Sequence, residues 1–250
     1  MSFPLRLERR PEPSRIMRLL SPLIAIAAML VTGGIVFALL GHEPLHALHA
    51  FFVLPLNSMY GVGELLLKAT PLCLCALGLA IGFRANVWNI GAEGQFTLGA
   101  ICGGGVALFW ADTLGVLAMP TMLLAGIAGG MAWAAIPAWL RTRFNTSEIL
   151  VSLMLVYVAQ LLLAWLIHGG WRDPAGFNFP QSKAFDDRLI LPVLADGQRA
   201  TIATLFALVL AGVSWVFTTR LFAGYRMLVA GQAPAAAAYA GFSERRNVWL

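Results

Sequence analysis

Five strongly polar side chains lie within one short stretch, residues 83–96, of a chain that is otherwise mostly apolar. They are Arg84, Asn86, Asn89, Glu93 and Gln95. Amide and carboxylate groups at this density can hydrogen-bond a polar solute. A carboxylate facing lipid would cost about 2.5–3.5 kcal/mol, so we expect Glu93 to face protein or water. This stretch is therefore the first candidate for a functional site.

The glycines within this stretch indicate how its backbone is built. Gly91 and Gly94 stand among the amides, which favours a break between two helices rather than one continuous rod. Glu93 would then lie in the first turn of the following helix, where a carboxylate suits the helix dipole. One interpretation is a solvated turn with a good N-terminal cap. The other is a broken helix buried among membrane spans, an arrangement that often builds transport sites.

Composition identifies the elements that must position these residues. Of the 250 residues, 59% are hydrophobic and 12% are charged, whereas a soluble domain carries about 25% charged residues. The mean hydropathy is +0.77. The apolar runs are continuous and about 20 residues long, which matches helices that cross a bilayer. The sequence therefore predicts an all-α, polytopic transmembrane helix bundle of about six spans, at residues 16–40, 64–83, 95–111, 117–140, 148–168 and 201–219.

The arginines predict the orientation of the chain and its division into segments. They concentrate in the N-terminus and in alternate loops, flanking the apolar runs, as cytoplasmic segments do. We therefore expect a basic cytoplasmic N-terminus at 1–15, a transmembrane domain at 16–230 with an external loop at 169–200, and a cytoplasmic segment at 231–250. The net charge of +5 then reflects membrane topology, so we expect membrane lipid and no nucleic acid as a partner.

Pairs of glycines predict where helices pack closely. Gly99 and Gly103 are four residues apart in the third expected span, as are Gly126 and Gly130 in the fourth. Small residues at this spacing let helix backbones approach each other in lipid. We interpret both pairs as packing surfaces.

The residues that could bind a metal do not form a convincing site. Cys73 and Cys75 lie in an apolar run at the wrong spacing for zinc and are interpreted as small hydrophobic residues. His42, His46 and His49 would share one face of a helix, but Pro44 interrupts it. We expect an interfacial role for these histidines, and neither a metal nor a cofactor.

Longer motifs resemble a known family. The sequence KATPLCLCALGLAIGFRANVWNIGAEGQFTLGA is similar to the signature region of permease subunits of ABC importers for nucleosides and simple sugars. That family belongs to the wider branched-chain amino acid and ribose permease group. Thr70-Pro71 and the run from Asn89 to Gln95 carry the resemblance. RTRFNTSEILVSLMLVYVA at 141–159 and GQAPAAAAYAGF at 231–242 agree with it, although Ser147 and Val156 stand where the family pattern has asparagine.

The resemblance implies a pathway for a nucleoside or a simple sugar. It also implies an external substrate-binding protein, for which the loop at 169–200 is the expected docking surface. Neutral solutes of this kind are bound by amides and aromatic faces rather than by fixed charge. The expected substrate-path residues are Asn89, Glu93, Gln95, Glu148 and Tyr157.

The resemblance further implies that another subunit supplies the energy. The chain lacks a Gly-x-x-x-x-Gly-Lys-Ser/Thr phosphate loop, so we expect no enzyme activity and a separate ATP-binding subunit. We expect Gly231 and Pro234 to start a short helix that contacts this subunit. The coupling residues implied are Gly231, Ala237, Ala238, Tyr239, Ala240 and Gly241. A second permease subunit, the same chain or a related one, would complete the pathway in the cytoplasmic (inner) membrane of a bacterium, with the N-terminus in the cytoplasm. Family members continue through further spans, so these are expected after Leu250.

Three alternatives remain open from the sequence. The same machine could carry branched-chain amino acids. An ion-coupled secondary transporter would need ionisable residues inside its spans, and the first, fourth and sixth expected spans have none in their interiors. A membrane enzyme would need polar groups converging at one depth, whereas His168, Glu93 and Asp112 are scattered along the chain.

Overall fold

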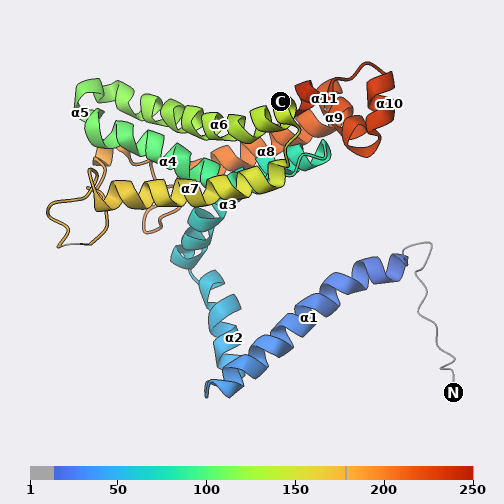
Figure 1. Ribbon diagram of the computed structural model, residues 1–250. Helices are drawn as coiled ribbons and strands as arrows, with labels where there is room; N and C mark the ends of the chain where they lie inside the picture. Colours follow the sequence, from blue (N-terminus) through green and yellow to red (C-terminus); the bar gives the residue numbers. More distant parts are fainter. Residues whose placement is uncertain (1–13, 178, 250) are drawn as a thin grey trace, which may run out of the picture. The chain divides into compact units, whose positions relative to one another are not determined.

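The computed structural model describes residues 14–177 and 179–249 and shows a helical protein (Figure 1). The expected 1–15 segment lies almost entirely outside the described residues. Short 3-10 turns occur at Leu54–Leu56, Gly115–Leu117 and Asp187–Leu189. The α-helices are α1 Arg15–Leu39, α2 Pro44–Phe52, α3 Met59–Arg84, α4 Ala92–Phe109, α5 Ala111–Leu114, α6 Ala118–Phe144, α7 Glu148–His168, α8 Ala203–Arg220, α9 Phe222–Gln232, α10 Pro234–Tyr239 and α11 Glu244–Val248.

These helices confirm the prediction of an all-α polytopic bundle. Among the described residues, five segments are long and apolar enough to cross a membrane: Ile16–Leu39, Met59–Arg84, Ala111–Phe144, Glu148–His168 and Ala203–Arg220. The expected span at 95–111 is the helix α4, which is not among these five. Its first turn contains Glu93 and Gln95, and a glycine run lies at 103–105.

The chain divides into two compact units, Met1–Leu65 and Leu66–Leu250. In the first unit, Ser14 caps α1 by accepting a hydrogen bond from the backbone N–H of Met17. Phe37 of α1 lies against Phe51 of α2, with ring centroids 6.4 Å apart. The segment expected to be broken by its prolines is thus a short helix that begins at Pro44 and a 3-10 turn that contains Pro55.

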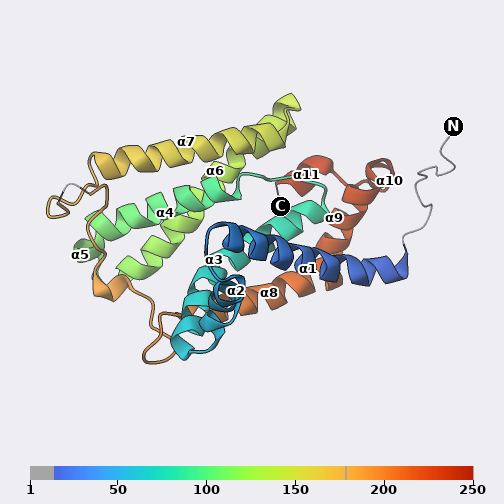
Figure 2. The ribbon, with the colours of Figure 1, turned by 90° about the horizontal axis from the view of Figure 1, so that it is seen from below.

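The second unit is organised around α4, which packs against α6 and α7 (Figures 1 and 2). A Cβ added to Gly99 would lie 3.0 Å from the carbonyl oxygen of Gly126, and one added to Gly103 would lie 3.0 Å from that of Met122. Because such contacts leave no room for a side chain, the predicted glycine packing between these two helices is confirmed.

The other face of α4 packs on α7. Leu98 and Ile101 of α4 form a buried cluster with Ala159 of α7, and Trp133 of α6 packs against it. The Trp133 indole N–H donates to the carbonyl oxygen of Leu155, 3.3 Å away, which satisfies the polar end of an otherwise apolar side chain. α4, α6 and α7 therefore form one packed layer of helices.

A buried hydroxyl pair links α3 to α8. The Oγ1 atoms of Thr70 and Thr204 are 2.9 Å apart, and Thr70 also donates to the carbonyl oxygen of Leu66. Leu66 and Pro71 belong to the same helix, α3, and Leu66 precedes the proline by slightly more than one helical turn. Interhelical hydrogen bonds of this kind contribute about 0.6 kcal/mol on average in membrane bundles.

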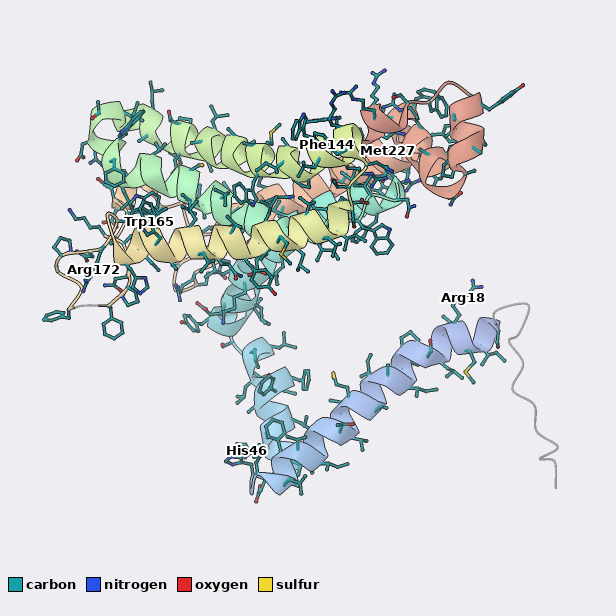
Figure 3. All side chains as sticks on the ribbon, in the orientation of Figure 1. Arg18, His46, Phe144, Trp165, Arg172 and Met227 are labelled. Atoms are coloured by element: carbon teal, nitrogen blue, oxygen red, sulfur yellow. The ribbon has the colours of Figure 1, made fainter. Side chains whose placement is uncertain are left out.

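The two ends of the second unit differ in composition. At one end, the last turn of α6 and the helices α9, α10 and α11 bring together the basic segments (Figure 1). At the other end lie α5 and the 169–200 segment, where Arg172 is labelled in Figure 3. The described residues of the 169–200 segment contain one 3-10 turn and one isolated bridge, between Arg172 and Ser182, and Val193 forms a further bridge with Thr201.

Candidate functional site

The polar stretch forms a break between α3 and α4, as the glycines and amides predict. Asn86 adopts a left-handed conformation with φ +56°, just after the end of α3. The N–H of Val87 bonds to the Gly82 carbonyl oxygen, and the N–H of Asn86 bonds to that of Phe83. These two bonds define a Schellman motif, which satisfies the last carbonyl groups of α3 and redirects the chain.

Asn89 and Gln95 face each other across this break. The Asn89 Nδ2 donates to Gln95 Oε1 at 3.1 Å, and the Gln95 Nε2 lies 3.3 Å from Asn89 Oδ1. Asn89 Oδ1 also accepts a hydrogen bond of 2.9 Å from the backbone N–H of Gly91. Asn89 thus both holds the turn into α4 and presents an amide to the adjacent space.

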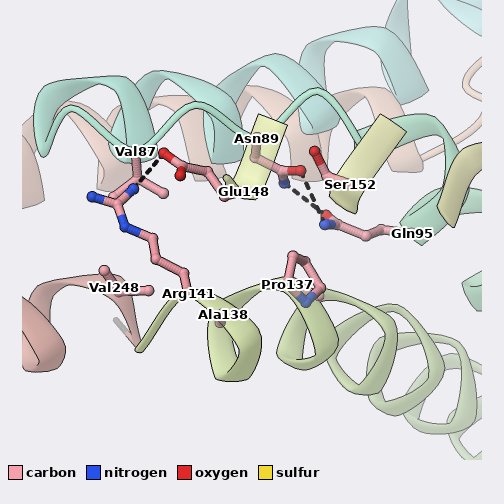
Figure 4. Close-up of a pocket in the computed structure, with 10 residues that line it drawn as sticks. Val87, Asn89, Gln95, Pro137, Ala138, Arg141, Glu148, Ser152 and Val248 are labelled. Carbon is pink, nitrogen blue, oxygen red and sulfur yellow. Dashed lines mark hydrogen bonds and ion pairs between the residues drawn. The ribbon is translucent and has the colours of Figure 1, made fainter. Parts of the chain in front are cut away.

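That space is a cavity of about 130 Å³ between the break, α6 and α7 (Figure 4). It contains three of the five expected substrate-path residues, namely Asn89, Gln95 and Glu148. The remaining walls are mostly apolar, and one comes from the C-terminal segment. The lining residues are Val87, Asn89, Gln95, Ala134, Pro137, Ala138, Arg141, Glu148, Ser152 and Val248.

An ion pair forms one edge of the cavity. The guanidinium of Arg141, in the last turn of α6, bonds to the carboxylate of Glu148 in the first turn of α7 (Figure 4). Both side chains are 19% exposed. Glu148 Oε1 also lies 3.4 Å from the backbone N of Trp88, so its carboxylate is shared between α6 and the break.

Ser152 joins α7 to the break on the cavity wall. Its hydroxyl accepts a hydrogen bond from the backbone N–H of Ile90 and donates to the carbonyl oxygen of Ile149. A Cβ added to Gly91 would lie 2.8 Å from the Ser152 Cβ, so Gly91 is required for this contact.

Sequence reasoning missed Arg141 and Ser152 as lining residues. The available signal was their position relative to Glu148. Ser152 lies one helical turn after Glu148 on α7, whereas Arg141 precedes it across the short α6–α7 turn. The side chains of Arg141 and Ser152 can therefore both lie near that of Glu148.

The other two expected substrate-path residues lie elsewhere. Glu93 is exposed and accepts a hydrogen bond of 2.7 Å from Gln160 Nε2, near the middle of α7. Tyr157 is also exposed on α7. The sequence predicts that Glu93 faces protein or water, and its carboxylate contacts Gln160 of the neighbouring helix α7. Neither Glu93 nor Tyr157 is among the residues that line the cavity.

The expected coupling segment begins differently from the prediction. Gly231 does not start a helix, because α9 continues to Gln232 and a new helix, α10, begins at Pro234. Ala233 between them has φ −143° and ψ 77°. A residue before proline avoids the helical region, which ends α9, and proline then suits the first position of α10.

Gly231 instead provides a contact site. A Cβ added to it would collide with the carbonyl oxygen of Arg84 and would lie 3.1 Å from the backbone N of Asn86. The end of α9 is therefore packed directly on the backbone of the α3–α4 break. Any shift of α9 would be transmitted to the chain that carries Asn89.

The end of α10 presents one aromatic side chain outward. Gly241, with φ +77°, completes a Schellman motif in which the Phe242 N–H bonds to the Ala237 carbonyl oxygen. Ala237 is buried, whereas Tyr239 is 97% exposed. Phe242, by contrast, packs edge-to-face on Phe222 within the chain.

The last helix, α11, connects this segment to the cavity. Asn247 is buried, and its Oδ1 accepts a hydrogen bond of 3.0 Å from the Arg226 Nε of α9. Val248 follows it and lines the cavity beside Arg141. α11 thus contributes Val248 to the cavity wall, and α9 contacts the backbone of the α3–α4 break.

This arrangement suits reversible binding of a polar solute. The cavity offers amide donors and acceptors, one serine hydroxyl and an ion pair, with apolar walls between them. No group of three or more His, Cys, Asp or Glu residues that could hold a metal ion occurs in the part of the chain that the structure describes.

Comparisons with known proteins identify the family of this chain. Residues 61–250 match the family described as the branched-chain amino acid transport system permease component. The chain is 37% identical to the glucose ABC transporter permease protein TsgB13 of Haloferax volcanii, over 92% of this chain and 62% of that protein. It is 27% identical to the nucleoside ABC transporter permease protein NupB of Lactococcus lactis (93% and 66%) and 28% identical to the guanosine ABC transporter permease protein NupP of Bacillus subtilis (94% and 67%).

The chain spans less than two thirds of the length of TsgB13 and of NupB. No solved structure matches it significantly. The family match nevertheless covers the cavity, the α3–α4 break and the coupling segment together. With its apolar spans and its matched region, this chain is a multi-pass membrane protein of the branched-chain amino acid transport system permease family.

Proposed function

We propose that this chain is the transmembrane permease subunit of an ATP-driven (ABC) importer and that it forms the pathway for a nucleoside or a simple sugar. The observation that carries the proposal is the contact between a hydrogen-bonding cavity and the segment 231–250, which we place in the cytoplasm. Gly231 packs on the break that holds Asn89, and Val248 lines the cavity itself. The names of the relatives, a glucose permease and two nucleoside permeases, support this solute class.

The amides of Asn89 and Gln95 are suited to hydroxyl and base-edge groups. Each amide carries two donors and an acceptor with two lone pairs, so part of this capacity remains for a solute after the two side chains bond to each other. Arg141 and Glu148 neutralise each other at the cavity edge. A neutral, hydroxylated solute therefore fits this cavity better than an ion does.

A separate ATP-binding subunit would drive the transport. Tyr239 projects from α10 with nearly all of its surface exposed, as an anchor for a partner groove would. A push on α10 would pass through α9 to the α3–α4 break. A second permease subunit, the same or related, and an external binding protein at the 169–200 loop complete the proposed machine. Its proposed location is the bacterial inner membrane, with the N-terminus in the cytoplasm.

A solute panel tests this proposal. Cells that express the complete transporter are given radiolabelled guanosine, glucose and leucine in separate assays. We expect uptake of guanosine or glucose that falls at least tenfold when Gln95 is changed to leucine. Uptake of leucine alone would instead favour a branched-chain amino acid permease, which the family description also covers.

The same substitution at Gln160 provides a matched control. Gln160 bonds to Glu93, away from the cavity, so Gln160→Leu removes an amide of equal size that does not line the cavity. We expect Gln160→Leu to reduce uptake less than Gln95→Leu does. If only Gln160→Leu abolishes uptake, the solute passes along the Glu93 face rather than through the cavity.

A further inference from the structure

A second cavity, beside the first, has a different chemical character. It has a volume of about 220 Å³ and lies between the last turn of α6 and α11. Its walls come from two segments that are about a hundred residues apart in the sequence. The residues that line it are Arg141, Thr142, Arg143, Asn145, Arg245 and Val248.

The charged side chains that line this cavity are all positive. Three arginines line it, and none of the described lining residues is acidic. Arg141 is already bonded to Glu148, but Arg143 and Arg245 are exposed and come from opposite walls. Guanidinium groups form two parallel hydrogen bonds with phosphate oxygens, so two of them facing one space favour a phosphate group.

Exposed aromatic side chains favour a position of the cavity at the membrane surface. Trp139 and Phe144, on the same turns of α6 as the arginines, are exposed and stack edge-to-face with centroids 5.4 Å apart. Phe83 and Trp88, at the end of α3, form a second exposed aromatic pair. Exposed tryptophans concentrate where membrane spans meet the lipid headgroups.

We propose that this arginine-lined cavity binds the phosphate of an anionic phospholipid headgroup. Basic pockets between helices on the cytoplasmic side of a membrane bind such headgroups. A phosphate held between Arg143 and Arg245 would fasten α11 to the end of α6. Because α11 also contributes Val248 to the polar cavity, the bound lipid would steady one wall of that cavity.

The test measures lipid binding directly and needs no transport assay. The complete transporter is purified in detergent, and bound lipid is counted by native mass spectrometry after addition of cardiolipin or phosphatidylcholine. We expect retention of cardiolipin and a rise in melting temperature that phosphatidylcholine does not produce. The apparent cardiolipin affinity should fall about tenfold or more in Arg143→Gln and in Arg245→Gln.

Arg220→Gln is the matched control, since it removes the same charge from an exposed arginine outside the cavity. It should retain the affinity of the unchanged protein. Equal cardiolipin binding in all four proteins, or an equal loss in all three variants, would overturn the proposal. A melting shift caused by inorganic phosphate but not by cardiolipin would overturn the lipid source and leave a soluble phosphate site. Because Arg143 is exposed, its loss is not expected to unfold the protein, and size-exclusion elution checks this.

Discussion

Gly231 of α9 lies against the carbonyl oxygen of Arg84 at the end of α3, in a contact that leaves no room for a side chain. The segment that we assign to coupling is thereby fixed to the break that positions Asn89. In the proposed machine, this contact would carry a movement of α9 to the α3–α4 break.

The first prediction concerns this contact. Gly231→Leu should separate α9 from the break and lower uptake at least tenfold, which corresponds to ~1.4 kcal/mol at 25 °C. Insertion in the membrane should be unaffected. Gly212→Leu in α8 is the control, because a Cβ there meets nothing within 4 Å. If both variants transport equally, α9 does not act through the break.

The second prediction concerns the exposed face of α10. Tyr239→Ala and Ala238→Asp remove or alter exposed side chains, so the melting temperature should change little. Uptake should fall while ATP hydrolysis no longer responds to solute. Ala238 is a better test position than Gly241, where φ +77° would strain any other residue. Normal uptake by both variants would remove the coupling role from this segment.

The third prediction concerns the amide pair in the cavity. Asn89→Ala removes the acceptor of the Gly91 N–H and should therefore reduce both stability and uptake, with a stability loss of about 1–3 kcal/mol. Asn89→Asp keeps that acceptor and should retain most of the stability while still losing uptake. Thermal unfolding and uptake are measured on the same preparations. Equal stability of the two variants would show that Asn89 does not hold the turn.

The fourth prediction concerns pH at the loop end. Arg188 hydrogen-bonds Asp186 through its Nε and also reaches Asp112 of α5, 3.3 Å away. The hydrogen bonds from the Arg188 side chain and backbone lower the pKa of Asp186 to about 2 from its usual value of 3.8. The stabilising contribution of this pair is thus fully present above about pH 4 and is lost as the pH falls toward 2. An NMR titration should show the pKa of Asp186 rising toward its usual value in Arg188→Gln, which keeps only the backbone hydrogen bond, and an unchanged pKa would contradict the assignment.

The ion pair of Asp186 bears on which loop residues could contact an external binding protein. Asp186 is already paired with Arg188 of the same loop. Asp173 accepts a hydrogen bond from the backbone N–H of Ala175. Arg172 and Asp187 are exposed and remain the better candidates for contact with a partner.

The sequence predicted the elements better than it predicted their contacts. The span at 148–168 coincides with α7, and the glycine pairs of α4 and α6 meet as expected, because both follow from local periodicity and from residue size. The second expected span is longer than predicted and begins at Met59, since Gly61, Gly63 and Glu64 hid its start. Val248 could not be assigned to the cavity, because only the folded chain brings α11 to α6.

The fifth prediction concerns topology. The substitution Tyr239→Cys places a thiol on the exposed end of α10, and this thiol should react with a membrane-impermeant maleimide only after the cells are opened. The unchanged chain, whose cysteines lie in α3 and α4 and are partly buried, is the control. Labelling of the variant in intact cells would place α10 outside and would reverse the proposed orientation.

The dependence of transport on ATP is the most direct test of the proposed function. The complete transporter, with its ATP-binding and external binding proteins, is reconstituted in vesicles, and accumulation of labelled guanosine or glucose is followed with and without ATP. We expect accumulation that requires ATP and that a protonophore does not reduce. Accumulation without ATP that the protonophore abolishes would identify an ion-coupled transporter and contradict the assignment.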